Sequence, residues 1–428
     1  MSTLTSLTSQ SCQSLDDWLR FIEQQHPQHQ IELGLDRVRQ VADRAELSRL
    51  PGKVVLIAGT NGKGTTACCM EQLLLAQDFT VAVYSSPHLL RFNERLRING
   101  SDAPDSAWVE ALRFIEQLRA DIELTYFEFT TLAAFYLIKT QEPDFALIEV
   151  GLGGRLDATN IVEPDLSILT TIDLDHQDWL GPDREAIGRE KAGIFRPGKV
   201  AVVAEQALPA SVLDVAERLQ APLLRAGSAY RWQCQQDGWD WQCETLAFHG
   251  LPLLPVPLQN AATALMALQQ LQRLPNEALL RRALASVSLP GRMQLLQQDP
   301  AVLLDVAHNP QSIAYLADRL AQLRPGYRRV IALCGMMKDK VQTGALDALL
   351  PWVDHWVLSP LPAPRGADAT MLQQILPATA RVFRCPDVAT GYRQSLASLA
   401  ADDLLLVFGS FVTVSAVLEQ STAQPEVR

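Results

Sequence analysis

The sequence predicts an α/β fold with two domains, a large doubly wound parallel sheet followed by a smaller α/β domain. Short runs rich in Val, Ile and Leu recur along the chain without polar alternation, as in strands buried on both faces of a parallel sheet. Stretches with helical periodicity separate these runs, so strands and helices alternate along the chain. A glycine-rich loop follows the first of the runs.

Apolar runs along the chain are predicted to be strands. They are residues 53–58, 80–84, 144–149, 166–171, 199–204, 301–305, 329–333, 356–359 and 403–408. Residues 65–77, 106–118 and 311–323 have the periodicity of helices. Residues 232–243 are predicted to form a hairpin, because Gln236, Asp237 and Gly238 give a turn signal at their centre.

Length and composition narrow the class of protein. The 428 residues suggest two or three domains, and 48% hydrophobic with 20% charged residues is ordinary globular usage. A net charge of −11 disfavours nucleic acid or an anionic membrane as the main partner. Seven cysteines without a C-x-x-C pair indicate neither a disulfide framework nor a Cys-rich zinc site. With no signal peptide or membrane span in the sequence, we expect a cytoplasmic protein.

A new series of strands and helices begins after the segment Ser288, Leu289, Pro290 and Gly291. We therefore expect one domain over residues 1–287 and a second over residues 288–428.

Residues 59–65 read G-T-N-G-K-G-T between a predicted strand and a predicted helix. Such a loop points backbone N–H groups at phosphate oxygens, and the helix dipole adds positive potential. Lys63 would reach the β- and γ-phosphates and Thr65 would lie near Mg²⁺. The alternative is a tight glycine turn with a solvated lysine.

Polar residues follow three further strands and are candidate metal ligands. Ser86 follows residues 80–84 and offers a hydroxyl, although taken alone a simple Ser-Pro turn is the better interpretation. Glu149 ends an apolar strand, where a carboxylate is costly unless it binds a metal or pairs with a cation such as Arg155. His176 follows residues 166–171 among carboxylates that could orient it, or it is a satisfied structural histidine.

Lys191 follows Glu190 on a predicted helix that ends near Pro197 and Gly198. By charge pattern alone it is an ordinary lysine on a solvated helix face.

The second domain adds further candidates. Arg292 lies where the domains join and could swing onto a phosphate, or it is a surface arginine. Asp305 ends a strand, where an acid often binds a ribose hydroxyl. Asn309 before Pro310 also reads as a helix N-cap. The loops that contain Lys338 and Ser410 could hold an anionic second substrate.

These motifs, in this order, resemble the folylpolyglutamate synthase family of the Mur-ligase superfamily, over residues 31 to 411. The resemblance rests on residues 59–65, 86–89, 149–160, 190–193 and 305–310. Residues 31–35 and 125–129 are most similar to the bifunctional bacterial branch, the dihydrofolate synthase/folylpolyglutamate synthases. Val306 departs from the family pattern, in which many members have glycine.

The resemblance implies a P-loop ATPase domain and a smaller Rossmann-like glutamate ligase domain, with ATP and Mg²⁺ as cofactors. It implies that L-glutamate is added to 7,8-dihydropteroate and to tetrahydrofolate in folate biosynthesis and one-carbon metabolism, by a monomer. The implied metal ligands are Ser86, Glu149, His176 and a carbamylated Lys191. The implied ATP-binding residues are Thr60, Asn61, Gly62, Lys63, Asn260, Arg292 and Asp305. The implied substrate-binding residues are Glu32, Leu33, Gly34, Thr125, Tyr126, Phe127, Glu128, Leu156, Asp157, Ala158 and Ser410.

The implied chemistry is amide ligation through an acyl phosphate, with Lys63 neutralising the transferring phosphoryl group and His308 as a possible base. One alternative is a Mur-type cell-wall ligase with a UDP-sugar peptide substrate, against which the match over residues 125–129 argues. Another is a nucleotide-binding regulator without ligase activity, which would need no loop like residues 151–160.

Overall fold

A computed structural model describes residues 8–423 of the chain, and these residues form two compact units. The first unit takes the described residues up to His88 together with Phe92–Val287. The second takes Leu89–Arg91 and the described chain from Ser288 on. Each unit has its own sheet of mainly parallel strands, which confirms the predicted α/β class.

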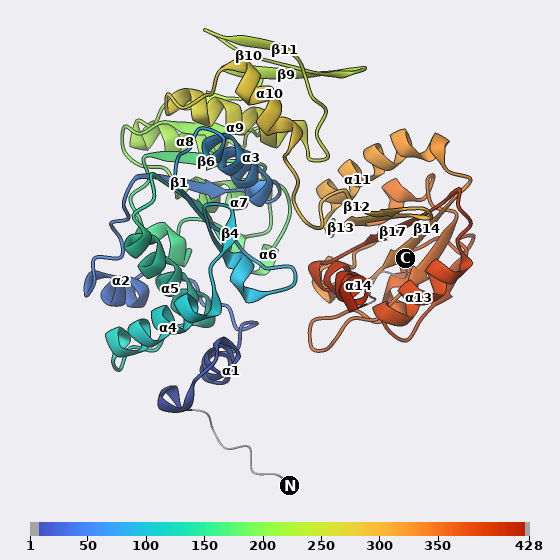
Figure 1. The fold of residues 1–428 in the computed structure, drawn as a ribbon, viewed down its shortest axis with the longest axis horizontal. Coiled ribbons are helices and arrows are strands. Elements are labelled where there is room, and N and C mark those ends of the chain that lie inside the picture. The colour runs from blue at the N-terminus through green and yellow to red at the C-terminus, as the bar shows by residue number, and fades with distance from the viewer. Residues whose placement is uncertain (1–7, 424–428) are drawn as a thin grey trace. The chain divides into compact units, whose positions relative to one another are not determined.

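The first unit alternates strands with helices over most of its length (Figure 1). Its α-helices are α1 (Leu15–Gln25), α2 (Asp36–Asp43), α3 (Lys63–Leu75), α4 (Asp105–Arg119), α5 (Tyr126–Gln141), α6 (Gln177–Leu180), α7 (Arg184–Ala192), α8 (Ala210–Leu219), α9 (Leu258–Gln270) and α10 (Glu277–Ala285). Its strands are β1 (Lys53–Ala58), β2 (Val81–Tyr84), β3 (Leu96–Ile98), β4 (Ser101–Asp102), β5 (Phe145–Glu149), β6 (Leu166–Leu169), β7 (Ala201–Val203), β8 (Leu223–Arg225), β9 (Tyr230–Gln235), β10 (Gly238–Cys243) and β11 (Ala247–Leu251). Short 3₁₀ helices are η1 (Ser9–Ser11), η2 (Phe92–Arg95) and η3 (Ala158–Ile161).

The main sheet of this unit has the order β4-β3-β2-β5-β1-β6-β7-β8. Six strands run parallel to one another, namely β2, β5, β1, β6, β7 and β8 in spatial order. The strands β3 and β4 are antiparallel additions at one edge. In the register, Ile57 of β1 lies opposite Glu149 of β5, and Tyr84 of β2 lies opposite Ile148. The carboxyl ends of β2, β5, β1 and β6 therefore meet at one edge of the sheet.

The predicted strands of this unit are found within two residues of the expected bounds. The strand β1 has the predicted range, and β5 begins one residue later than predicted. The strand β6 ends at Leu169, two residues early, because the next residues bond to another loop: Thr170 Oγ1 donates to the carbonyl of Asn61 over 2.7 Å.

The sheet is covered on both faces. One face packs into a continuous apolar core with α1, α2, α4, α5, α7 and α8, and Trp108 and Phe135 in this core are fully buried. The helices α3 and α9 pack against each other and contact the sheet through β5 and β7. Burial on both faces explains why the strands are apolar throughout.

The predicted hairpin is confirmed and belongs to a separate antiparallel sheet of order β11-β10-β9. Figure 1 shows this sheet beside α9 and α10, at one end of the first unit. Trp239 and Trp241 of β10 are fully buried, and Trp241 Nε1 donates to the carbonyl of Ala262 on α9 over 3.0 Å. Trp241 therefore attaches the small sheet to α9.

The second unit is a three-layered α/β structure. Its helices are α11 (Pro310–Leu323), α12 (Ala369–Gln374), α13 (Val388–Ser398) and α14 (Phe411–Ala423), with the short 3₁₀ helices η4 (Arg324–Gly326), η5 (Lys338–Lys340) and η6 (Asp347–Leu349). Its strands are β12 (Gln294–Gln298), β13 (Ala301–Asp305), β14 (Arg329–Cys334), β15 (His355–Leu358), β16 (Val382–Arg384) and β17 (Asp403–Phe408). They form a sheet of order β12-β13-β17-β14-β15-β16, in which β12 alone is antiparallel. One apolar cluster joins the sheet to α11 and α12, and another joins it to α13 and α14 on the opposite face.

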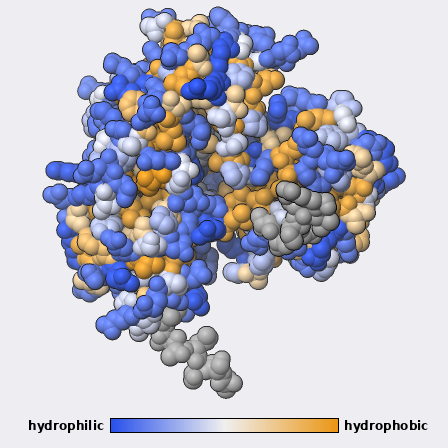
Figure 2. All heavy atoms as spheres, viewed as in Figure 1, coloured by the Kyte–Doolittle hydropathy of each residue, from blue (hydrophilic) through white to orange (hydrophobic). Residues whose placement is uncertain are grey.

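The surface turned to the reader in Figure 2 is mostly hydrophilic, with apolar areas that are separated from one another. Within residues 8–423, we find no helix with the length and apolar character needed to cross a bilayer.

Candidate active site

The phosphate-loop sequence and the three polar strand ends occupy neighbouring positions at one edge of the first unit's sheet. The loop follows β1, Ser86 follows β2, Glu149 is the last residue of β5, and His176 follows β6. The order β2-β5-β1-β6 makes these strands direct neighbours. In a parallel sheet the edge at the carboxyl ends of the strands is where ligands bind.

Glycine allows the loop after β1 to approach α9 closely. Gly62 has φ 90° and immediately precedes α3. A Cβ atom at Gly62 would lie 2.4 Å from Asn260 Oδ1 on α9, so the backbone and the Asn260 side chain approach each other here more closely than any other residue would allow. The helix α3 begins at Lys63, directly after Gly62. Its first backbone N–H groups are therefore next to the loop, which is the arrangement that binds phosphate in other proteins.

The end of β6 fixes the position of the loop. The backbone N–H of Thr60 donates to the Thr171 carbonyl over 2.7 Å, and that of Asn61 donates to Thr171 Oγ1 over 2.9 Å. Lys63 Nζ folds back over the loop and donates to the Gly59 carbonyl over 3.0 Å. The ammonium group thus lies on the loop, and the alternative of a solvated lysine is wrong, because the Lys63 side chain is only 16% exposed.

Glu149 lies beside this lysine. Its Oε1 is 3.8 Å from Lys63 Nζ, and a Cβ atom at Gly64 would lie 3.2 Å from its Oε2. The alternative of a salt bridge between Glu149 and Arg155 is wrong, because Arg155 Nη2 pairs with Glu190 Oε1 over 2.9 Å. A mostly buried carboxylate at the first turn of α3 fits a role in binding a cation that accompanies phosphate.

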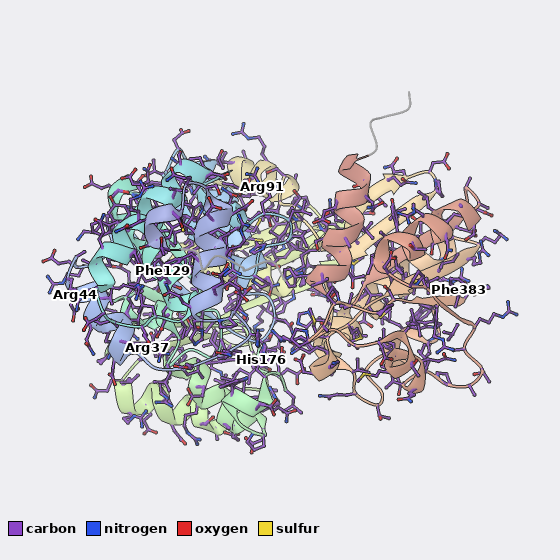
Figure 3. The ribbon with its side chains drawn as sticks, turned by 90° about the horizontal axis from the view of Figure 1, so that it is seen from below. Arg37, Arg44, Arg91, Phe129, His176 and Phe383 are labelled. Atoms are coloured by element: carbon purple, nitrogen blue, oxygen red, sulfur yellow. The ribbon has the colours of Figure 1, made fainter. Side chains whose placement is uncertain are left out.

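His176 follows β6 and precedes α6, in a left-handed conformation with φ 51°. Its backbone N–H donates to Asp175 Oδ1 over 2.8 Å, and its Nε2 lies 3.9 Å from the same oxygen. The predicted neighbouring carboxylate is therefore present and fixes the backbone at the histidine. Figure 3 labels His176.

The environment of Lys191 differs from the solvated helix face that the charge pattern predicts. It is 4% exposed, not on a solvated face, and α7 ends at Ala192 rather than near Pro197 and Gly198. Burial, and then the positive charge of Lys63, lower the pKa of Lys191 to about 7, against the opposing pull of Asp175. Near neutral pH much of this amine is unprotonated and nucleophilic.

The glycine-rich loop after β5 packs against the backbone that carries Lys191. A Cβ atom at Gly154 would lie 2.8 Å from the Glu190 carbonyl oxygen and 2.9 Å from that of Lys191. The Arg155 N–H donates to the Glu190 carbonyl over 2.8 Å, and Asn160 Nδ2 donates to the Gly193 carbonyl over 3.1 Å. The loop therefore sets the position of the buried lysine.

The three segments expected to surround a pterin come together in the first unit. The Gly34 N–H, two residues after Glu32 and next to Leu33, donates to the Leu156 carbonyl over 3.3 Å. Thr125 caps α5 and forms a capping box with Glu128, the third residue of the helix. The first contact joins segments that lie far apart in the sequence, whereas the capping box is local to the start of α5.

Aromatic and acidic side chains complete this region. Phe127 packs on Gly151, where a Cβ atom would lie 2.4 Å from its Cζ, and Tyr126 is buried. The Asp157 carboxylate accepts the N–H groups of Leu152 (2.7 Å) and Thr159 (3.0 Å), and burial raises its pKa despite these bonds. Asp157 and the buried Ala158 thus begin η3 in a fixed conformation.

Sequence reasoning missed Arg37, which joins Glu32 to Glu128. An ion pair between residues 91 positions apart leaves no local pattern. The one local signal is an arginine two residues after the segment 31–35.

In the second unit, Asp305 ends β13 and is buried. Its carboxylate accepts the N–H groups of Met293 (2.9 Å) and Ala307 (2.8 Å). Burial raises the pKa of Asp305, whereas the nearby Arg292 lowers it. The Arg292 guanidinium carbon lies 5.1 Å from the centre of the Phe411 ring, and its side chain is half-buried rather than a free surface arginine.

The turn after β13 presents His308 and starts α11. His308 Nδ1 lies 2.8 Å from the Val306 carbonyl oxygen; because a carbonyl only accepts, Nδ1 carries the proton and Nε2 the lone pair. The predicted N-cap is confirmed, since Asn309 Oδ1 accepts the Ser312 N–H over 3.0 Å with Pro310 at the first helical position. Ser410 is buried, and its Oγ accepts the Thr413 N–H over 3.0 Å.

The predicted metal ligands are chemically mixed. Among residues 8–423, no group of three or more His, Cys, Asp or Glu side chains could hold a metal ion by itself. The expected set has only one carboxylate and one imidazole, completed by the Ser86 hydroxyl and by Lys191. This set fits Mg²⁺, which prefers oxygen ligands and keeps several waters, only if Lys191 supplies oxygen.

Comparisons with known proteins match both units. Residues 57–218 match the family described as Mur ligase middle domain, and residues 291–411 match the Mur ligase, glutamate ligase domain. The chain is 45% identical over 412 residues to the dihydrofolate synthase/folylpolyglutamate synthase of Escherichia coli (strain K12), with 96% of each chain covered. It is 40% identical over 421 residues to the protein of the same name from Haemophilus influenzae, covering 94% of this chain and 96% of that one.

Solved structures are similar over nearly the whole chain. Escherichia coli FolC in complex with DHPP and ADP has a TM-score of 0.92 and 44% identity, over 96% of this chain and 98% of that one. The bifunctional folylpolyglutamate synthase/dihydrofolate synthase of Yersinia pestis, complexed with AMPPNP and Mn ion, has a TM-score of 0.89 and 48% identity, with the same coverage.

Proposed function

The chain belongs to the dihydrofolate synthase/folylpolyglutamate synthase family of Mur ligases, and we propose on this basis that it is an ATP-dependent ligase that joins L-glutamate to 7,8-dihydropteroate and to tetrahydrofolate. The observation that carries the proposal is the group formed by Lys63, Glu149 and the buried Lys191 at the carboxyl edge of the sheet. Similar proteins have been solved with ADP and DHPP, and with Mn, AMPPNP and L-glutamate.

The nucleotide is assigned to the phosphate loop. The backbone of Thr60, Asn61 and Gly62 faces the N-terminus of α3 and would hold the phosphates, with Lys63 neutralising the β- and γ-phosphates. Asn260 approaches Gly62 and would contact the nucleotide from α9. We assign residues 1–287 to ATP and the pterin, and residues 288–428, with Arg292, Asp305 and Ser410, to completing the nucleotide site and receiving glutamate.

Ser86, Glu149, His176 and Lys191 would hold Mg²⁺. Mg²⁺ supplies charge neutralisation at the phosphoryl group when it is bound. Lys191 would take part as a carbamate: its neutral Nζ attacks the carbon of CO₂ and loses a proton, which replaces a cation by a carboxylate-like oxygen ligand. A buried lysine with a pKa of about 7 supports this, since an amine with the usual pKa would be protonated.

The pterin would lie among Glu32 to Gly34, Thr125 to Glu128 and Leu156 to Ala158. The contacts between these segments and the ring of Phe127 support this assignment.

The proposed reaction is an amide ligation in two steps. The substrate carboxylate attacks the γ-phosphorus of ATP, ADP leaves, and an acyl phosphate forms. Lys63 stabilises the charge on the transferring group. The amine of L-glutamate then attacks the acyl carbon, its proton passes to a base, and phosphate leaves. His308 Nε2 is the proposed base, because the Val306 carbonyl fixes the proton on Nδ1. We further propose that the protein acts in the cytoplasm as a monomer.

The test is ADP release with 7,8-dihydropteroate, measured with and without L-glutamate, with mass analysis of the product. A glutamate-dependent rate and a product heavier by one glutamyl residue are expected, and tetrahydrofolate tests the second activity. ATP turnover that ignores glutamate and gives no amide would instead favour a nucleotide-binding regulator. No product from either pterin, but ligation of a UDP-sugar peptide, would favour a cell-wall ligase.

A further inference from the structure

We propose that Arg37 is a positioning residue that assembles the pterin-binding part of the site; this inference rests on the proposed function. Arg37 lies on α2, at its second position, and is labelled in Figure 3. Its guanidinium donates to two glutamates, Glu32 and Glu128, that belong to different pterin segments. No relation between these segments is visible in the sequence.

On one side, Arg37 fixes the start of α5. Its Nε lies 2.9 Å from Glu128 Oε1 and 2.8 Å from Oε2. Glu128 Oε2 also accepts the N–H of Thr125 over 2.8 Å. The Glu128 side chain is 3% exposed, so its carboxylate is enclosed and both its oxygens already accept hydrogen bonds. Glu128 therefore acts on the substrate through the backbone that it holds, from Thr125 to Glu128, and not as a ligand of its own.

On the other side, Arg37 holds the segment before α2. Its Nη1 donates to Glu32 Oε2 over 2.5 Å, and its Nη2 donates to the Glu32 carbonyl over 3.2 Å. These bonds lower the pKa of Glu32, which therefore stays ionised. The Gly34 N–H extends the chain of contacts to the third segment at Leu156.

The helix that carries Arg37 is itself fixed. Val38 and Val41 on α2 are fully buried in the core of the first unit, together with Ala42. Arg37 therefore reaches from a buried helix to residues 30–34, which have no regular structure of their own, and ties them to the buried first turn of α5. A planar guanidinium suits this task, because its donors point in fixed directions and can bridge two carboxylates.

Losing Arg37 would disturb the pterin and not the nucleotide. Glu128 would keep a buried negative charge without its cation, which favours either its protonation or a shift of the α5 start. Both changes alter the backbone offered to the pterin. The phosphate loop lies between β1 and α3, and among the described residues it makes no hydrogen bond or ion pair with Arg37.

The experiment compares Arg37→Ala with Arg37→Lys and with the matched control Arg39→Ala. Arg39 is on the same helix and is exposed, and no side-chain hydrogen bond or ion pair is found for it in the described part of the chain. Steady-state kinetics give KM for 7,8-dihydropteroate and for ATP separately. Calorimetric titration with dihydropteroate in the absence of ATP gives its Kd, and thermal unfolding gives Tm.

For Arg37→Ala we expect KM and Kd for dihydropteroate to rise about tenfold or more, the size expected on losing a charge-assisted bridge, with KM for ATP within twofold of wild type. Arg37→Lys should bind dihydropteroate better than Arg37→Ala but less well than wild type. Lysine keeps the positive charge but lacks the planar set of donors that bridges both carboxylates. Arg39→Ala should match wild type. If Arg37→Ala folds with unchanged KM and Kd for dihydropteroate, or raises both substrates' KM equally, the inference is wrong.

Glu32→Gln covers the case in which Arg37→Ala does not fold. The Glu32 side chain is 56% exposed, so this variant should fold, and we expect its Kd for dihydropteroate to rise two- to fivefold. An unchanged Kd in folded Glu32→Gln would overturn the inference. Failure of the proposed function is a different result, because wild-type protein would then form no amide from either pterin.

Discussion

Arg95 Nε donates a 3.0 Å hydrogen bond to His88 Nδ1, two residues beyond Ser86. Arg95 is 2% exposed, and its guanidinium carbon lies 5.8 Å from the ring centre of Tyr126. Arginine only donates, so His88 must accept with a bare Nδ1 and be neutral. Burial, and then the charge of Arg95, lower the pKa of His88 to about 4.

This pair predicts how stability depends on pH. Between pH 6.5 and pH 4 the unfolded chain takes up a proton at His88 and the native protein does not, so the free energy of unfolding falls as the pH falls. At pH 4.5 the loss from this residue is about 2–3 kcal/mol. His88→Gln keeps an acceptor for Arg95 without titrating. Urea unfolding should therefore show that the free energy of unfolding falls less between pH 7 and pH 4.5 in His88→Gln than in wild type. An equal fall in both proteins would contradict the assignment of a neutral His88.

Lys63→Ala should abolish ligation while the protein stays folded. The ammonium group lies over the phosphate loop, where it would stabilise charge that develops during transfer, a contribution of about 10²–10³-fold in kcat. ADP release in the presence of dihydropteroate and glutamate measures it. Lys53→Ala, at the other end of β1 in an exposed pair with Asp165, is the control and should be near wild type. Near-wild-type turnover in Lys63→Ala would remove the nucleotide assignment.

Lys191 should react with CO₂. After exposure to ¹³C-bicarbonate, wild-type protein should give a carbamate carbon signal in NMR, and Lys191→Ala should not. The signal should be stronger at pH 8 than at pH 6, because a pKa of about 7 leaves more neutral amine at the higher pH. Lys191→Ala should lose activity, and short carboxylic acids such as acetate should restore part of it. Full activity without any rescue would exclude a carbamate role.

Gly154→Ala should disturb Lys191 from a distance. The added methyl group would lie 2.8 Å and 2.9 Å from two carbonyl oxygens of α7, so the loop or the helix must move, at a cost of about 1–3 kcal/mol. We expect a lower Tm and a weaker carbamate signal. Gly326→Ala is the control, since its Cβ would meet nothing within 4 Å. If Gly154→Ala has the Tm and the carbamate signal of wild type, the loop at Gly154 does not pack tightly against α7.

Much of the fold could be predicted because apolar runs and glycine signals are local. The bounds of β1 and the turn between β9 and β10 follow directly from neighbouring residues. The position of Glu149 at a strand end also follows, because the strand before it is apolar throughout.

The electrostatics of the site could not be predicted in the same way. Lys191 has a polar neighbourhood in sequence but is buried in space, where its backbone packs against the loop at Gly154, 37 residues earlier in the chain. The sequence suggests Arg155 as a partner for Glu149, yet the Arg155 guanidinium pairs with Glu190. Contacts of this kind join residues that are far apart in the sequence. They depend on the tertiary fold, which local hydrophobic periodicity does not encode.

The short segment Leu89–Arg91 has a consequence for how the protein can be dissected. It belongs to the second unit, where Leu89 packs against the apolar cluster that includes Val306 and Val414. A gene fragment starting at Ser288 would therefore encode a domain with a missing piece of its own interior, and one ending at Val287 would carry that piece as an exposed leucine. The two halves of the enzyme are interleaved in the polypeptide, so recombining them between relatives requires exchanging three residues as well as the carboxyl-terminal third.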